Sequence, residues 1–174
     1  MRKERKGSDK SSDKSNEDRI TVDGWVELMV TDSEGRVKAF RGAREDKNVI
    51  TYRGVAAIIR LVFENFVESR FRYIAIGTGT AIERPDQIML VNEIKRKAAN
   101  ALQITTDIQD DTVMLETLFS QEDGLTGIHN IAEVGVFNDP TSGIMLARKT
   151  HTPITVNWDL GDNLYVRYFI QIRR

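Results

Sequence analysis

The sequence contains no cysteine, few aromatic residues and almost no net charge. Without cysteine the chain forms no disulfide and offers no thiol nucleophile or thiolate zinc ligand. Its 25 Lys and Arg residues nearly balance its 26 Asp and Glu residues, which argues against a surface field that attracts nucleic acid or membrane. No apolar run approaches the roughly 18–20 residues that span a bilayer, and none follows the basic N-terminus as in a signal peptide. We therefore expect no membrane segment.

Charge is distributed unevenly along the 174 residues. Residues 1–19 carry seven basic and five acidic side chains, four serines and a single apolar residue, Met1. The segment has net charge +2, which leaves −3 on the other 155 residues. Such a segment cannot bury enough surface to offset its ordering entropy, so we expect a disordered arm in isolation. It acts either as a solvated tail or as an arm that orders against a partner in an assembly or on a polyanion.

The remaining residues, 20–174, are long enough for one domain with its own core and read mostly as β-structure. Val22, Val26, Leu28 and Val30 occupy alternate positions, followed by turn residues 32–35 and a second short run to residue 41. This pattern predicts an N-terminal hairpin over 20–42. Residues 164–173 alternate in the same way and predict a final strand.

Further strands are predicted in the region 71–174. Turn-rich segments separate four strand-like runs, at residues 112–120, 128–138, 144–151 and 153–158. A longer alternating run covers 94–108.

One helix is predicted at 48–67, with Asn48 as its N-cap. Its apolar residues recur at steps of three and four and form a stripe wide enough to pack against a sheet. A second helical turn is expected near 86–91. The chain is thus predicted to be mainly β: an antiparallel β-sandwich or barrel-like domain with one buried amphipathic helix and a disordered N-terminal arm.

Gly77 and Gly79 follow an apolar strand in the sequence YIAIGTGT, a position where phosphate-binding loops occur. The dinucleotide motif requires a third glycine, but Ile82 stands there, and the Gly-Lys-Ser/Thr ending of a nucleotide-triphosphate loop is also missing. We therefore expect a tight turn after the strand. His129 and His151 have no metal-type neighbours in the sequence, so we expect no metal site and no cofactor.

Two glutamates are more informative. Glu133 interrupts an apolar strand, where a carboxylate must be exposed or held by a cation or backbone N–H groups. Arg96 and Arg148 are candidate partners for such a carboxylate. We favour a structural salt bridge over catalysis, because a catalytic pair would need both glutamates in one cleft with a raised pKa.

Aromatic residues provide candidate interface anchors. Trp25, Trp158, Tyr165 and Phe169 suit a core or an interface as well as a stacking platform.

The order of the segments resembles a family of small virion proteins of tailed bacteriophages, described as tail-fibre, tail-collar or other tail-associated structural proteins. The matching pieces are residues 48–51 (NVIT), 73–80 (YIAIGTGT), 90–96 (LVNEIKR), 131–137 (IAEVGVF), 143–148 (GIMLAR) and the final alternating strand.

The resemblance implies a non-enzymatic, β-rich building block of a virion that is assembled in the host cytoplasm. It implies a homo-oligomer, a trimer or ring, that contacts itself and other virion proteins at the baseplate, tail tip, collar or fibre attachment. This sequence differs from longer fibre proteins because no shaft or receptor-binding region follows Ile172, and because a hairpin and charged arm precede Asn48. Alternative roles are a capsid decoration or head-fibre protein, or a carbohydrate-binding β-sandwich module that contacts a glycan or receptor. We expect no enzyme activity and no binding to nucleic acid.

Overall fold

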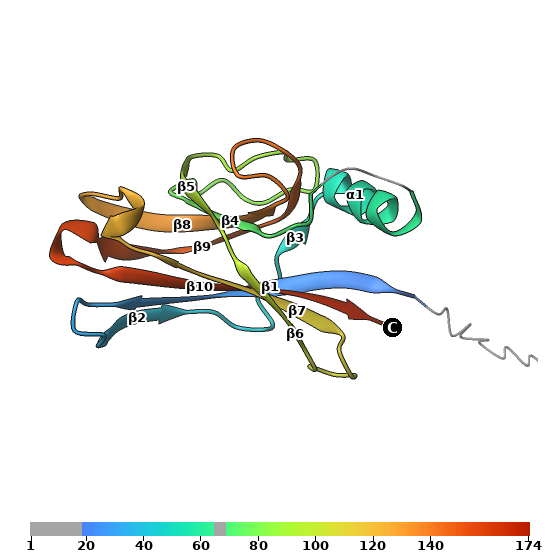
Figure 1. Cartoon of the computed structure of the whole chain (residues 1–174), viewed down its shortest axis with the longest axis horizontal. Coiled ribbons are helices and arrows are strands. Elements are labelled where there is room, and N and C mark those ends of the chain that lie inside the picture. The colour runs from blue at the N-terminus through green and yellow to red at the C-terminus, as the bar shows by residue number, and fades with distance from the viewer. Residues whose placement is uncertain (1–18, 65–68) are drawn as a thin grey trace, which may run out of the picture.

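Alternating apolar side chains build two antiparallel five-stranded sheets that face each other in a sandwich (Figure 1). The computed structural model describes residues 19–64 and 69–174. The first sheet, sheet A, has the strand order β2-β1-β10-β7-β6, and sheet B has the order β3-β9-β8-β4-β5. The strands of sheet A are β1 (Thr21–Thr31), β2 (Val37–Arg41), β6 (Asn100–Ile104), β7 (Thr112–Phe119) and β10 (Asn163–Arg173). Those of sheet B are β3 (Val49–Ile50), β4 (Tyr73–Gly77), β5 (Glu93–Ala98), β8 (Ile128–Phe137) and β9 (Met145–Asn157).

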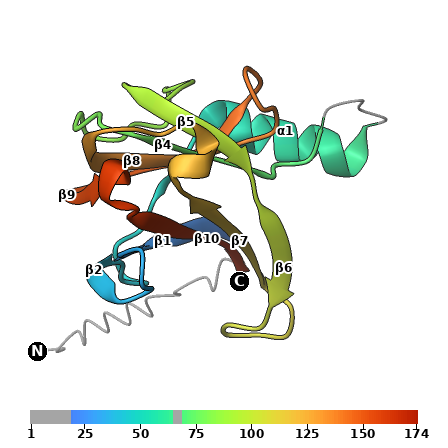
Figure 2. The same ribbon diagram turned by 60° about the vertical axis from the view of Figure 1, so that its left-hand side comes forward.

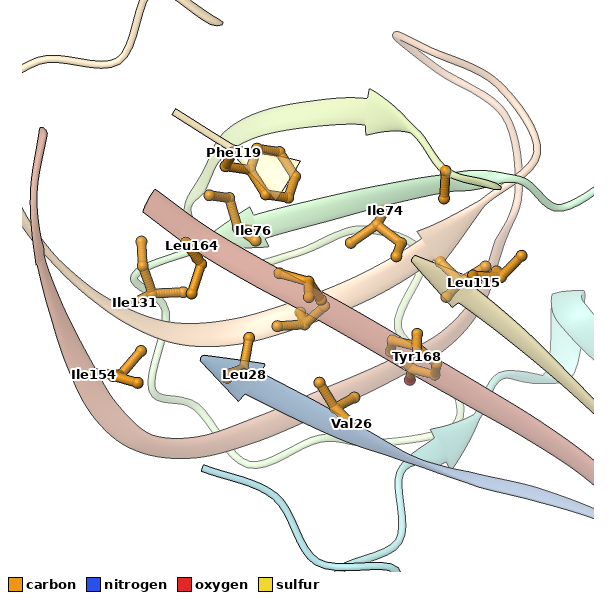
Figure 3. Packing of buried hydrophobic residues seen from close by; sticks show 14 of the residues in the cluster. Val26, Leu28, Ile74, Ile76, Leu115, Phe119, Ile131, Ile154, Leu164 and Tyr168 are labelled. Atoms are coloured by element: carbon orange, nitrogen blue, oxygen red, sulfur yellow. The ribbon is translucent and has the colours of Figure 1, made fainter. Parts of the chain in front are cut away.

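The core lies between the two sheets (Figure 3). Leu28 and Tyr168 from sheet A and Ile74 and Ile131 from sheet B are all buried in it. The sheets form an open sandwich and do not close into a barrel. The predicted mainly-β fold class is confirmed, and of the two predicted architectures the structure has the β-sandwich. The predicted hairpin is also confirmed, because β1 pairs with β2 on one side and along its whole length with β10 on the other.

The long alternating run 94–108 spans both sheets. β5 pairs with β4 in sheet B, and β6 pairs with β7 in sheet A. Between them lies Ala99, which is buried in the core and donates its backbone N–H to the Arg72 carbonyl at 2.7 Å. The segment therefore passes from one layer to the other at Ala99 (Figure 2).

The helix, α1 (Tyr52–Phe63), is shorter than the predicted 48–67 and has a different N-cap. Thr51 caps it, because its side-chain oxygen accepts the Gly54 N–H at 2.9 Å. Asn48 is wrong as the cap: its side chain donates to the Tyr168 hydroxyl at 2.8 Å inside the sandwich. The helix buries only Gly54 and Ala57 completely, so its burial is less extensive than its wide apolar stripe predicted.

Two other sequence predictions need correction. The strands expected at 144–151 and 153–158 are one strand, β9. Pro153 is tolerated inside it because the described strand β3 pairs with β9 only at Ala147 and Arg148, and because the pairing with β8 is irregular opposite residues 151–153. The helical turn expected near 86–91 is absent, and those residues belong to an irregular loop. The predicted arm, residues 1–19, lies outside the described residues except for Arg19.

Candidate functional site

The charged residues and the glycines singled out by the sequence gather on the outer face of sheet B. Strand register places Glu133 of β8 beside Gly77 of β4, and Gly77 beside Glu93 of β5. Two residues further along β8, Gly135 pairs with Arg148 of β9. Residues 78–92, which join β4 to β5 and are here named the covering loop, contribute hydrogen bonds to this face.

The Glu133 carboxylate has no exposed surface and accepts hydrogen bonds at both oxygens. Its Oε1 accepts the backbone N–H groups of Gly79 at 3.0 Å and Asn92 at 2.7 Å. Its Oε2 accepts the N–H of Val91 at 3.0 Å and Nε of Arg148 at 2.9 Å. Because donors from the loop and from β9 meet at one carboxylate, Glu133 fastens the covering loop to the sheet.

Arg148 completes this buried pair. Its guanidinium is also fully buried, and Nη2 lies 2.8 Å from Glu133 Oε2. Its Nη1 donates to Gln87 Oε1 in the covering loop at 2.9 Å. An unpaired charge in this position would carry a large desolvation penalty, so each of the two ions depends on the other.

Gly77 and Gly79 make room for the carboxylate. A Cβ on Gly77 would lie 2.6 Å from Glu133 Oε1, and a Cβ on Gly79 would lie still closer. The tight turn expected after the strand is wrong: residues 78–80 form no turn, and the Thr78 N–H instead donates to the Asn92 carbonyl at 3.0 Å, at the end of the pairing of β4 with β5. The glycine segment thus does hold an anion, but the anion is a carboxylate of the same chain.

Glu93 and Arg96 form a second pair on this face. The Arg96 guanidinium binds both Glu93 oxygens, at 3.0 and 2.7 Å. It also donates to the carbonyls of Asp139 and Ser142, and it lies 3.5 Å from the centre of the Phe137 ring. Arg96 therefore connects β5 to the loop between β8 and β9.

A third set of contacts holds the middle of the covering loop. Lys149, beside Arg148 in β9, binds Asp46 and lies 3.3 Å from Glu83 of the loop. Burial raises the pKa of Glu83, but hydrogen bonding from Thr150 and the charge of Lys149 outweigh it, so the net pKa is lowered. These groups stabilise the ionised form of Glu83.

The arrangement suits a structural role better than acid–base chemistry. Each carboxylate is bound by its own arginine, and both Glu133 oxygens already accept two hydrogen bonds. The proposed partners were Arg96 and Arg148, and the structure assigns Arg148 to Glu133 and Arg96 to Glu93.

The aromatic candidates lie elsewhere and are mostly buried. Trp25 and Phe169 stack on each other with ring centres 4.5 Å apart, and the charged groups of Arg44 and Lys47 lie over Trp25. Trp158 is completely buried in the core. Trp158 therefore cannot be an interface anchor, and Trp25 and Phe169 offer little surface to a partner.

Tyr165 is only partly buried and remains available for contacts. It lines a small pocket on sheet A with Glu27, Met29, Phe40 and Arg167. Sequence reasoning did not identify Phe40, which is half exposed, because the short β2 run gave no clear apolar pattern.

Gln87, Glu83 and Lys149 were also not identified from the sequence. Gln87 and Glu83 lie in a loop without periodicity, so no sequence signal marks them. Lys149 directly follows Arg148 in a strand that is otherwise apolar at its start, and that unusual pair of cations is the signal that could have found it.

Within residues 19–64 and 69–174 no group of three or more His, Asp or Glu side chains is placed to hold a metal ion. Among the same residues, no helix is both long and apolar enough to cross a membrane.

Comparisons with protein-family models, with curated proteins and with solved structures gave no match.

Proposed function

We propose that the chain is a non-enzymatic structural subunit of a tailed-phage virion, located in the tail at the baseplate, tail tip, collar or fibre attachment. The proposal begins with the resemblance in segment order. The main structural support for the proposal is that those segments lie together in the fold. Residues 73–80, 90–96, 131–137 and 143–148 all contribute to the Glu133–Arg148 and Glu93–Arg96 layer on sheet B.

This placement gives the shared segments a structural purpose. Two buried or half-buried arginines fasten two long loops to one face of the sandwich. Loops that are bound to the underlying sheet can form rigid surfaces for contact with neighbouring subunits. A repeated building block requires such surfaces.

Charge and exposed apolar surface also support a self-assembling subunit. The net charge of −1 adds little repulsion when copies pack in a trimer or ring. Several large apolar side chains are at least 44% exposed on the covering loop and the helix, where they can contact a neighbour. The charged arm is proposed to order against such a neighbour.

A capsid decoration or head-fibre role would use the same surfaces and is distinguished by location alone. The carbohydrate-binding alternative is weaker. Trp25 is 6% exposed and Trp158 is fully buried, so neither tryptophan can stack on a sugar ring.

Labelling of virions tests the proposal. Antibodies raised against the purified full chain should bind particles at the tail in electron micrographs. Labelling over the head would favour the decoration role, and particles that carry no copy of the chain would contradict a virion role.

Deletion of residues 1–18 tests the arm. The proposal expects the truncated chain to keep the thermal stability of its sandwich and to lose assembly or incorporation into particles. Unchanged assembly would return the arm to the role of a solvated tail.

A further inference from the structure

Helix α1 is apolar on two opposite faces, and only one of them is covered. The inner face buries Gly54 and Ala57, and Gly54 lies so close to β9 that a Cβ would be 2.8 Å from Leu146 Cα. The outer face carries five large apolar side chains that are 48–76% exposed. These are Tyr52, Val55, Ile59, Val62 and Phe63. We name them the outer stripe.

The spacing of the outer stripe is that of a helix–helix contact. Val55, Ile59 and Val62 follow the pattern i, i+4, i+7, which places them on one side of a helix with 3.6 residues per turn. A helix that is apolar all round is normally buried. With aromatic side chains at both ends, the stripe presents on the order of 600 Å². That area approaches the ~800 Å² that each partner contributes to a stable interface.

We propose that the outer stripe packs antiparallel against the same stripe of a second copy of this chain, across a two-fold axis near Ile59. This proposal rests on the proposed function only in requiring self-association, and it does not depend on a location in the virion. In this arrangement Val55 faces Val62 of the partner subunit, and Ile59 lies close to the partner's Ile59. Figures 1 and 2 show α1 at the periphery of the sandwich, where its outer side can meet another molecule.

Charge on the helix favours a second copy in the antiparallel direction. Arg53 lies in the first turn of α1 and Glu64 is its C-cap, eleven residues or close to three helical turns apart along the chain. Antiparallel packing centred between residues 58 and 59 brings Arg53 level with Glu64 of the partner subunit, and the two-fold axis makes this pair twice. Parallel packing about a two-fold axis would set Arg53 level with the partner's Arg53 but on opposite flanks of the contact, and it would form no Arg53–Glu64 pair. Arg60 lies near its own copy only in the antiparallel arrangement, which is one like-charge approach against two opposite-charge pairs.

Cysteine cross-linking tests the geometry directly, because the chain has no cysteine of its own. V55C and V62C are prepared as separate full-length proteins and oxidised alone and mixed. Antiparallel packing predicts a strong disulfide-linked dimer in the mixture and little in either protein alone, since like positions lie about 10 Å apart along the axis. I59C alone should also cross-link. Cross-linking of V55C with itself would show parallel packing, and no cross-linking in any sample would overturn the proposal.

Sedimentation equilibrium measures the energetic side of the interface. Ile59→Lys should weaken self-association by at least about tenfold. Leu102→Lys is the matched control, because Leu102 on β6 is 56% exposed against 52% for Ile59, and it should leave association unchanged. Arg53→Glu should weaken association, and the double variant R53E/E64R should recover it.

The outcomes separate this proposal from the proposed function. If the native chain self-associates and Ile59→Lys associates equally well, the helix interface is refuted and the assembling subunit survives. If the native chain is monomeric at every concentration, both fail. Circular dichroism of each variant confirms that the sandwich is folded.

Discussion

At the residue scale, the buried pair Glu133–Arg148 determines how the covering loop is held. The carboxylate accepts three backbone N–H groups of the loop in addition to the arginine. Part of this could be predicted from the sequence, because a carboxylate that interrupts an apolar strand needs a cation or N–H donors. The loop donors could not be predicted, since only the folded path of residues 78–92 brings them to Glu133.

Removing both ions of the pair should cost less than the sum of the two single removals. We expect Glu133→Gln or Arg148→Met to lower the free energy of unfolding by about 3–5 kcal/mol, because a buried charge or a set of N–H donors then lacks its partner. The double variant E133L/R148M should cost less than the two single changes together. Urea denaturation gives these values. Additive losses would show that the two side chains act independently.

Glu93→Gln is the surface counterpart of that experiment. The Glu93 side chain is 29% exposed, and surface ion pairs contribute about 1 kcal/mol or less. We expect a correspondingly small loss in urea denaturation. A loss as large as that of Glu133→Gln would assign Glu93 a role that its exposure does not explain.

Asp111 gives the chain an acid-sensitive contact at the end of sheet A. Its Oδ2 accepts the Gln171 amide at 2.7 Å, and its two oxygens accept backbone N–H groups of residues 106–108. Burial raises the pKa of Asp111, but these hydrogen bonds outweigh it and hold the pKa well below the ordinary 3.8. The unfolded chain therefore takes up the proton first as pH falls.

It follows that the stabilisation from Asp111 is complete above the ordinary pKa of 3.8 and is lost as pH falls below it. In urea titrations, the stability difference between the native chain and Asp111→Asn should be constant from about pH 7 to 5 and shrink toward pH 2. A difference that does not change with pH would show that the carboxylate charge makes no contribution.

At the scale of elements, the sequence predicted strands with clear alternation and missed features that depend on tertiary contacts. β1 and β10 were predicted because apolar residues alternate along them, and β2 was predicted because turn residues 32–35 follow β1. The crossing from β5 to β6 was not, because alternation continues through Ala99 while the strand changes sheets. The helix was predicted, but its start was placed three residues early because Asn48 and Thr51 are both good caps.

The cap can be tested with two substitutions. Thr51→Ala should cost about 1 kcal/mol and speed hydrogen exchange at the Gly54 and Val55 amides, which bond to Thr51. Asn48→Ala should also destabilise the chain, because the buried Tyr168 hydroxyl loses its partner. It should leave exchange at those two helix amides unchanged. Faster exchange in Asn48→Ala instead of Thr51→Ala would restore Asn48 as the cap.

At the scale of the whole molecule, the features fit a subunit that is stable alone and built to be repeated. The core and the ion-pair layer are buried within the subunit, whereas the outer stripe of α1 and parts of the covering loop leave apolar side chains exposed. Sequence reasoning predicted self-association from the resemblance and named aromatic anchors for it, but it did not consider the outer stripe, because it assigned the apolar residues of the helix to the core.

Sedimentation equilibrium of the full-length chain, measured from low to high micromolar concentration, tests the central claim that this protein is a self-assembling structural subunit. The average mass should rise with concentration from the 19.8 kDa monomer to a defined multiple of it. A mass that stays at 19.8 kDa over the whole range would contradict it.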